Sequence, residues 1–151
     1  MSKQTVINFY SVSDEHGEFS NFSPHSIRLD GKVWPTSEHY FQAQKFRDKT
    51  HQEEIRRVKS PMEAARMGRS RKRPLRKDWE SIKDQVMRTA VLAKFTQHDD
   101  VRALLLSTGN AKLVEHTTND SYWGDGGDGS GKNMLGRILM EVREQLRPTN
   151  G

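Results

Sequence analysis

The stretch KDWESIKDQVMRTAVLAKFTQ, residues 77–97, has the strongest helical periodicity in the chain. Its apolar residues recur every three or four positions, a spacing that places them on one face of an α-helix. They are Trp79, Ile82, Val86, Ala90 and Ala93. The stretch therefore predicts the central helix of the fold.

Shorter helices are predicted on both sides of this stretch. One begins near Thr36 and Ser37, which are candidate N-caps, and another begins at Ser60 with Pro61 at its first position. A last helix follows Asn133, a candidate cap, and carries one apolar stripe. Further helices are expected over 51–59 and over 98–108, the latter ended by Gly109.

Strand patterns occur near the N-terminus. Residues 5–11, TVINFYS, alternate and are rich in β-branched and aromatic types. Residues 25–35 contain two short apolar runs around Asp30 and Gly31, which predicts a hairpin. We therefore expect a mostly α member of the α+β class, with a small N-terminal β-sheet. No repeat or linker divides the sequence, so a single domain over 1–151 is expected.

Composition excludes several classes of protein. The chain of 151 residues has no cysteine, so disulfides, thiolate metal sites and cysteine nucleophiles are excluded. No apolar run reaches the length of a signal peptide core or of a membrane span. We expect a soluble, cytoplasmic protein that does not associate with membranes.

Positive charge is concentrated in one segment. The formal net charge is +5, and the segment RMGRSRKRPLRK, residues 66–77, holds a dense group of Lys and Arg. Such a cluster suits a phosphate group or a nucleic acid. A nucleic-acid-binding module without catalysis is therefore one hypothesis for the chain.

The glycine-rich stretch YWGDGGDGSGKN, residues 122–133, is close to a phosphate-binding loop but does not match one. Asn133 stands where that loop needs a Ser or Thr hydroxyl, and the preceding residues are polar instead of forming a buried strand. A calcium loop counted from Asp125 would need a glutamate where Gly136 stands, and no zinc motif occurs. We therefore predict neither a metal ion nor another cofactor.

Two residues of the same stretch favour a functional role. Trp123 offers a flat apolar face beside glycines, which suits the stacking of a planar ring. Asp125 lies between glycines and has few bulky neighbours. The alternative is that the stretch is only a tight connection into the last helix.

A second candidate group lies in SEHYFQAQK, residues 37–45. Glu38, Phe41, Gln42 and Lys45 are spaced so that all four project from one face of a helix. An acid, an amide and an amine on one face can perform acid–base chemistry on a polar substrate. The spacing alone favours a solvated helix face, with Glu38 as a partner of the helix dipole and Lys45 as a surface charge, so it leaves the function open.

Several motifs together resemble the YbiA/NADAR family. They are NFYSVSDEHGEFSNFSP, WPTSEHYFQAQKF, PMEAARMGR, DWESIKDQVMRTAVLAKF, LLLSTGNAKLVEHTTNDSYWGDGGDGSGKNMLG and LMEVREQL, in this order between Asn8 and Leu146. The resemblance implies a mostly helical domain and hydrolysis of N-glycosidic bonds. YbiA-like members act on early intermediates of riboflavin biosynthesis, which are ribosylamino-pyrimidinone phosphates. Other members remove ADP-ribose from guanine, including guanine in DNA.

The resemblance also implies the site residues. Glu38, Lys45 and Asp125 are the catalytic candidates, and Trp123 is a candidate for binding the substrate. The further binding candidates are Asn21, Gln42, Asn119, Asp120 and Asn133 for the sugar or base, and Arg66 and Arg69, with Lys45, for phosphate. The implied partner is a ribosylamine phosphate or an ADP-ribosylated guanine, with nucleic acid only as a substrate.

Two mechanisms are compatible with these residues. Glu38 can act on water or on the ribose hydroxyls while Asp125 lies near the leaving group or sugar, by analogy with the paired carboxylates of glycosidases. Alternatively, Lys45 with a pKa lowered by burial can attack the opened sugar and form a Schiff base. An exposed Lys45 would instead be a phosphate clamp.

Overall fold

The computed structural model describes residues 4–148, which form two compact units. Unit 1 consists of residues 4–23 and 95–148 of the described chain. Unit 2 consists of residues 24–94. The prediction of a single domain over residues 1–151 stays a prediction.

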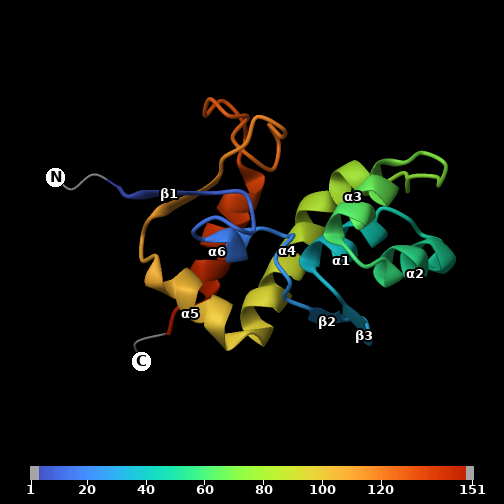
Figure 1. Cartoon of the computed structure of the whole chain (residues 1–151), viewed down its shortest axis with the longest axis horizontal. Helices are drawn as coiled ribbons and strands as arrows, with labels where there is room; N and C mark the ends of the chain where they lie inside the picture. The colour runs from blue at the N-terminus through green and yellow to red at the C-terminus, as the bar shows by residue number, and fades with distance from the viewer. Residues whose placement is uncertain (1–3, 149–151) are drawn as a thin grey trace. The chain divides into compact units, whose positions relative to one another are not determined.

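Unit 2 contains a β-hairpin and the N-terminal helices (Figure 1). The hairpin consists of β2 (Ile27–Leu29) and β3 (Lys32–Trp34), which pair antiparallel. Asp30 and Gly31 form its turn with φ values of 57° and 73°, so the predicted hairpin is confirmed. The helices are α1 (Ser37–Ala43), α2 (Lys49–Arg57), α3 (Pro61–Arg69) and the first part of α4 (Trp79–Gln97).

Local sequence explains where these helices begin. The Thr36 side chain accepts a hydrogen bond from the backbone N–H of His39 at the start of α1, and Ser60 does the same for Glu63 in α3. Pro61 occupies the first turn of α3, as predicted. Helices α1, α2 and α3 pack against one another around a shared apolar cluster that includes Trp34, Tyr40, Ala43, Phe46, Ile55 and Ala64.

Unit 1 is assembled from the two ends of the chain. Strand β1 (Val6–Phe9) pairs in parallel with β4 (Lys112–Glu115), in a register that places Val6 beside Lys112. Helix α6 (Met134–Leu146) packs on β4 and on α5 (Asp99–Ser107), and a short 3-10 helix, η1, covers Gly17–Phe19. The buried side chains of this unit include Phe9, Phe19, Phe95, Leu105, Leu113, Ile138 and Leu139.

Three details differ from the sequence prediction. Helix α1 ends at Ala43, so Lys45 lies just beyond the helix instead of on it. Strand β4 was not predicted, and it supplies the partner of β1, so the strand at the N-terminus is not paired with the hairpin. Asn133 precedes α6 but makes no capping hydrogen bond with its side chain.

The fold class is as predicted. Six α-helices and two small two-stranded sheets make the described chain a mostly α protein of the α+β class. None of the helices in residues 4–148 is long and apolar enough to cross a membrane.

Candidate functional site

Glu38 and Gln42 lie on one face of α1, a helix whose residues are all buried. Their exposed fractions are 8% and 7%, which rejects the solvated face as an explanation of the spacing. The Gln42 amide Nε2 donates a hydrogen bond of 3.2 Å to Glu38 Oε1. A carboxyl group taken out of water in this way needs charged or polar neighbours. The pair is therefore the starting point of a site in unit 2.

Gln42 is held against α3 at a glycine. A Cβ atom at Gly68 would lie 1.7 Å from Gln42 Oε1 and 2.6 Å from its Cδ. The same Oε1 atom is buried without a hydrogen-bond partner among the described residues. Only the missing side chain of Gly68 lets the Gln42 amide take this position, from which it bonds Glu38.

We predict that Gly68→Ala lowers activity about 10-fold, because the new methyl group moves the Gln42 amide and releases Glu38. The free energy of unfolding should change by less than about 1 kcal/mol, because alanine also favours the helix. Steady-state kinetics and urea unfolding measure the two effects.

The control is a double-mutant cycle with Gln42→Ala. Once the Gln42 amide is gone, Gly68→Ala has nothing to displace and should cost no further activity. Additive losses from the two substitutions would show that Gly68 does not act through Gln42.

Lys45 lies two residues beyond the end of α1, and its amine interacts electrostatically with Glu38. Its Nζ atom lies 5.8 Å from the ring centroid of Phe41 and 6.0 Å from that of Trp79. The two rings are themselves in contact, with centroids 5.1 Å apart, and both are buried. The Lys45 amine therefore lies against an aromatic surface instead of in open water.

This environment lowers the pKa of Lys45 from 10.5 to about 8. Burial is the largest cause, since it disfavours the charged amine. The Glu38 carboxylate opposes the shift, and the positive charges of Arg71, Arg69 and Lys83 add to it. At pH 7 about a tenth of the molecules then carry a neutral amine, which is the nucleophilic form.

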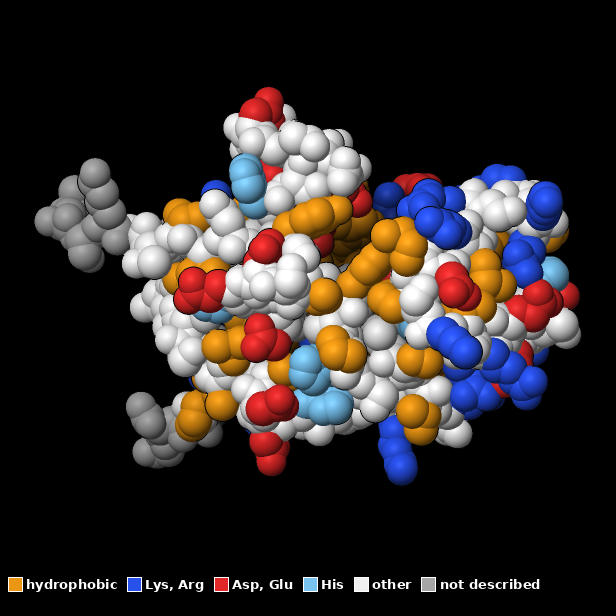
Figure 2. Space-filling view, viewed as in Figure 1, with side chains coloured by type: hydrophobic (Ala, Val, Ile, Leu, Met, Phe, Trp, Pro, Cys, Tyr) orange, Lys and Arg blue, Asp and Glu red, His pale blue; other side chains and the backbone are white. Residues whose placement is uncertain are grey.

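The cations near Lys45 belong to a larger basic surface. Figure 2 shows Lys and Arg side chains gathered over the part of unit 2 that holds α2 and α3. Arg66 and Arg69 are exposed in the last turn of α3. Some members of the basic segment are already paired, since Arg73 bonds Glu54 and Arg76 bonds Asp78. Of this basic surface, Arg69 and Arg71 lie close enough to Lys45 to lower its pKa.

The glycine-rich loop of unit 1 is tightly folded on itself. The Asp120 side chain accepts hydrogen bonds from the backbone N–H groups of Tyr122 and Trp123, at 2.9 and 2.8 Å. The half-buried Trp123 ring packs edge-on against Tyr122, with centroids 4.9 Å apart. Asp120 thus anchors the backbone at Tyr122 and Trp123, and its contact with a substrate stays a prediction.

Asp125 is buried at the base of the loop and accepts three hydrogen bonds. Thr117 and Gly127 donate their backbone N–H groups to Oδ1 at 3.0 and 2.9 Å. His116 Nδ1 lies 2.7 Å from Oδ2. Burial alone would raise the pKa of Asp125, but the hydrogen bonds from His116, Gly127 and Thr117 outweigh it and hold the pKa below its usual value. The carboxylate is therefore a fixed negative charge near neutral pH.

We predict that Asp125→Ala lowers the free energy of unfolding at pH 7 by about 3 kcal/mol, because it leaves buried backbone donors without an acceptor. The matched control is Asp128→Ala, where the carboxylate is exposed and accepts hydrogen bonds from the Ser130 backbone N–H and hydroxyl.

The difference between wild type and Asp125→Ala should shrink in acid. Since the pKa of Asp125 is lower in the folded than in the unfolded chain, its stabilisation is complete above the unfolded pKa of about 4. It is lost as the pH falls through the folded pKa. Urea unfolding at several pH values measures this, and a difference that grew in acid would contradict the assignment.

The remaining predicted binding residues have the following positions. Asn21 is buried, and Asn119 is exposed, where its side chain donates to the Tyr10 hydroxyl at 3.1 Å. Asn133 is buried, accepts from the Glu115 backbone N–H and donates to the Leu113 carbonyl. The Asn133 side chain thus holds β4 to the loop, and contact of these three residues with a substrate stays a prediction.

Three contributors were not predicted from the sequence. Trp79 was assigned to the apolar stripe of the helix over 77–97, and neither Gly68 nor His116 was named as a site residue. The roles of Trp79 and Gly68 depend on neighbours far along the chain, Lys45 and Gln42, so their local patterns gave no indication. Only the short distance between His116 and Asp125 in the sequence could have suggested that pair.

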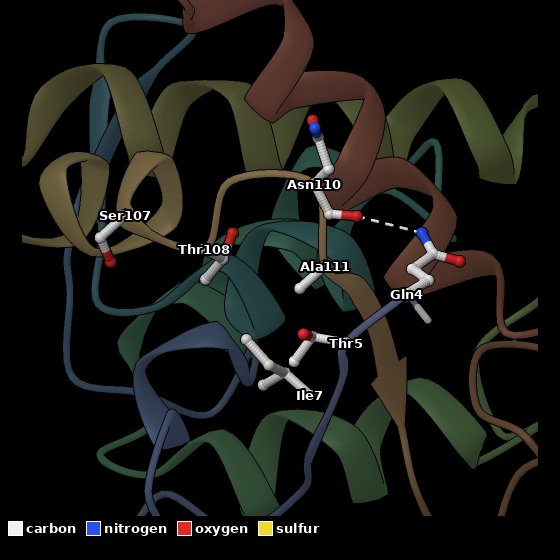
Figure 3. Close-up of a pocket in the computed structure, with 7 residues that line it drawn as sticks. All are labelled: Gln4, Thr5, Ile7, Ser107, Thr108, Asn110 and Ala111. Atoms are coloured by element: carbon white, nitrogen blue, oxygen red, sulfur yellow. Dashed lines mark hydrogen bonds between the residues drawn. The ribbon is translucent and has the colours of Figure 1, made fainter. Parts of the chain in front are cut away.

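Two further observations concern ligand sites outside the predicted residues. Figure 3 shows an open pocket in unit 1, where Gln4 Nε2 donates to the Asn110 carbonyl at 3.0 Å. None of the predicted site residues lines this pocket, which is formed by Gln4, Thr5, Ile7, Ser107, Thr108, Asn110 and Ala111. Among residues 4–148, no group of three or more His, Cys, Asp or Glu side chains is arranged to hold a metal ion.

Comparison with known proteins extends over nearly the whole chain. Residues 8–147 match the NADAR domain. The sequence is 69% identical over 144 residues to N-glycosidase YbiA of Escherichia coli strain K12, covering 95% of this chain and 90% of that protein. It is 48% identical over 141 residues to riboflavin biosynthesis protein VVA0006 of Vibrio vulnificus strain YJ016, covering 93% of this chain but 38% of that longer protein. The NMR structure of the E. coli protein YbiA matches with a TM-score of 0.88 and 68% identity, over 97% of this chain and 87% of that one.

Proposed function

This chain belongs to the NADAR domain family and is an N-glycosidase, and on this premise we propose that it hydrolyses ribosylamino-pyrimidinone phosphates, early intermediates of riboflavin biosynthesis. The bond that breaks joins the anomeric carbon of ribose 5-phosphate to an amine on the pyrimidinone ring. The products are the free base and the sugar phosphate.

The observation that carries this proposal is the pairing of a lowered pKa at Lys45 with a buried carboxylate at Glu38. A ribosylamine opens readily to an imine, whose carbon is attacked by a neutral amine. Positive charge develops at this carbon as the base leaves, and a nearby carboxylate stabilises it. Glu38 supplies that charge and Lys45 supplies the nucleophile.

The surrounding cations suit the phosphate of the same substrate. Arg69, Arg71 and Lys83 are close enough to Lys45 to lower its pKa, so their field would attract an anionic group to this place. Arg66 lies one turn earlier on α3 than Arg69 and is also exposed. We assign these arginines to the phosphate and leave the Lys45 amine for the sugar carbon.

In the reaction, the Lys45 amine adds to the anomeric carbon of the opened sugar. The bond from that carbon to the pyrimidinone amine then breaks, its electron pair and a proton going to the leaving nitrogen. Water adds to the Schiff base that remains and releases the sugar phosphate, which regenerates Lys45. Stacking of the Trp123 ring on a planar base and a role of Asp125 as a fixed negative charge stay predictions.

The test compares two substrates with the purified protein. A ribosylamino-pyrimidinone phosphate and ADP-ribosylated guanosine are incubated separately, and free base is followed by chromatography against samples without protein. We expect release from the first at a rate at least 10-fold above that from the second.

Two other outcomes of this experiment would contradict the proposal, and each would favour a different function. Faster release from ADP-ribosylated guanosine would move the protein to the branch of the family that removes ADP-ribose from guanine. Release from neither, together with DNA binding that weakens steeply with salt, would favour a binding module that uses the basic surface.

A further inference from the structure

The backbone around Lys45 is held by a distant segment of unit 2. The end of a helix leaves carbonyl groups without a partner inside the helix. Beyond α1, the Lys45 carbonyl accepts a hydrogen bond of 2.9 Å from the Arg76 backbone N–H. The Gln44 carbonyl before it accepts a longer bond of 3.5 Å from Arg76 Nη1. The Phe46 carbonyl after it accepts from Gln52 Nε2 at 2.7 Å. Three consecutive carbonyl groups are thus fixed, and Arg76 holds two of them.

The Arg76 side chain is in turn fixed by Asp78. Arg76 Nε and Nη2 donate to Asp78 Oδ1 and Oδ2 at 2.6 and 3.0 Å, which makes the ion pair bidentate. Arg47 Nη2 donates to the same Oδ2 atom at 3.2 Å. Ion pairs near a surface restrict a structure little unless they are bidentate or form a network, and this one does both. Asp78 therefore joins Arg76 to Arg47, which lies two residues after Lys45.

The same segment carries one of the rings that contact the Lys45 amine. Trp79 begins α4 and donates its backbone N–H to the Arg76 carbonyl at 3.3 Å. Its ring centroid lies 6.0 Å from Lys45 Nζ. Residues 76–79 therefore contact Lys45 at both ends, with a backbone N–H on its carbonyl and an aromatic ring beside its amine. Because a lysine has a flexible four-carbon stem, both contacts are needed to restrict the position of the amine.

From these contacts we propose that Arg76 and Asp78 are positioning residues of the reaction, whose ion pair holds residues 76–79 against Lys45. The inference rests on the proposed function, in which Lys45 is the nucleophile, and it names the residues that keep this nucleophile in place. Neither residue touches the substrate in this role. Since misplacement of a reacting group by about 1 Å can cost about 100-fold in rate, the pair acts on catalysis through Lys45.

The position of the Lys45 amine also determines its protonation. Burial is the largest cause of the fall in the Lys45 pKa from 10.5 to about 8. The Glu38 carboxylate opposes this fall, and the cations that add to it are Arg71, Arg69 and Lys83. An amine that leaves this place regains contact with water, so its pKa rises toward 10.5. Loss of the ion pair should therefore change the pH dependence of the rate as well as the rate.

The experiment measures kcat and KM of Asp78→Asn on a ribosylamino-pyrimidinone phosphate between pH 7 and pH 10. Asparagine keeps the size of the side chain but has no charge and only one acceptor oxygen, so the bidentate pair is lost. We expect kcat to fall about 10-fold at pH 7, because fewer molecules carry the neutral amine. At pH 10, where the amine is largely neutral in both proteins, the loss should shrink below about 3-fold, with KM within about 3-fold throughout.

Two further variants are the controls. Asp78→Glu keeps the carboxylate and should retain kcat within about 3-fold of wild type at every pH. Glu54→Gln breaks another ion pair of unit 2, in which Glu54 accepts from Arg73 Nη2 at 2.6 Å. Among residues 4–148, neither member of that pair forms a hydrogen bond with residues 44–47. Glu54→Gln should therefore keep both the wild-type rate and its pH dependence.

Chemical labelling measures the Lys45 amine without turnover. Acetic anhydride reacts with the neutral form of an amine, so the pH dependence of acetylation, read by mass spectrometry of the Lys45 peptide, gives the pKa. The midpoint should lie at about 8 in wild type and move toward 10.5 in Asp78→Asn. A misfolded fraction of the variant would lower kcat by the same factor at every pH and would not move this midpoint.

The inference is overturned by a loss in Asp78→Asn that is equal at pH 7 and pH 10 while the labelling midpoint stays at about 8. The ion pair would then only stabilise the fold. A kcat within about 2-fold of wild type at pH 7, or a change confined to KM, would also overturn it.

Failure of the proposed function has a separate signature. Wild-type protein that releases no base from the substrate at any pH would reject the N-glycosidase reaction proposed for Lys45, and with it a positioning role in that reaction, whatever the labelling shows. An active wild type with unchanged Asp78→Asn kinetics rejects only the inference about the ion pair.

Discussion

Glu38→Gln is expected to slow hydrolysis of the ribosylamine phosphate about 1,000-fold. The substitution keeps the size of the side chain and leaves an acceptor oxygen for the Gln42 amide, but it removes the buried negative charge. A carboxylate that stabilises positive charge in a site of low water content is worth several kcal/mol in the transition state. Steady-state kcat/KM values of the two proteins measure the loss.

Glu38→Gln should also change the pKa of Lys45. The Glu38 carboxylate opposes the lowering of the Lys45 pKa, so its removal should lower that pKa further below about 8. The residual activity of Glu38→Gln should therefore reach its plateau at a lower pH than that of wild type. A pH profile that kept its shape would show that Glu38 does not act on Lys45 electrostatically.

Gln42→Ala is the matched control for this charge. It removes the hydrogen bond to Glu38 and keeps the carboxylate, so the loss of activity should be about 10-fold instead of about 1,000-fold. If Gln42→Ala and Glu38→Gln lost activity to the same extent, the hydrogen bond between the two side chains would matter for the reaction and the charge of Glu38 would not.

Lys45→Met should abolish turnover to the limit of detection, a loss of about 1,000-fold or more, because it removes the nucleophilic amine. Lys45→Arg should be equally inactive, since it keeps the positive charge but has no nucleophilic form near neutral pH. If Lys45 were instead a clamp for the phosphate, Lys45→Arg would retain most of the wild-type rate. The comparison therefore separates the two roles that the sequence leaves open.

Trapping gives the direct evidence for the nucleophile. Borohydride added during turnover should reduce the Schiff base and add the mass of the sugar phosphate to the peptide that contains Lys45, in wild type only. Because the neutral amine is the reactive form, the rate of trapping should rise with pH and level off above about 8. A wild-type protein that turns over without any adduct would contradict the Schiff base and favour direct attack by water.

Elements with strong local patterns could be predicted from the sequence. Ser60 and Pro61 fix the start of α3, and Asp30 with Gly31 fixes the hairpin, because the relevant hydrogen bonds and dihedral angles involve residues only a few positions apart. The length of α1 was overestimated, since the periodicity continues to Lys45 although the helix ends at Ala43.

Elements that depend on distant partners could not be predicted. Strand β4 has four residues, and its pairing with β1 depends on chain segments that the local pattern does not connect. The candidate site likewise has features that the sequence could predict and features that it could not. The spacing of Glu38 and Gln42 indicated a shared face, but the contacts of Gln42 with Gly68 and of Lys45 with Trp79 are set by packing between helices.

The parallel pairing of β1 with β4 has a consequence for the order of folding during synthesis. Unit 2 is one continuous segment, residues 24–94, whereas unit 1 needs both ends of the chain. Val6 emerges from the ribosome roughly a hundred residues before its partner Lys112, and at about 5–20 residues per second it waits for several seconds. The hairpin and first helices can assemble in that interval, while β1 stays unpaired and open to association with other chains. Slower translation through the second half of the gene should therefore increase aggregation through this strand.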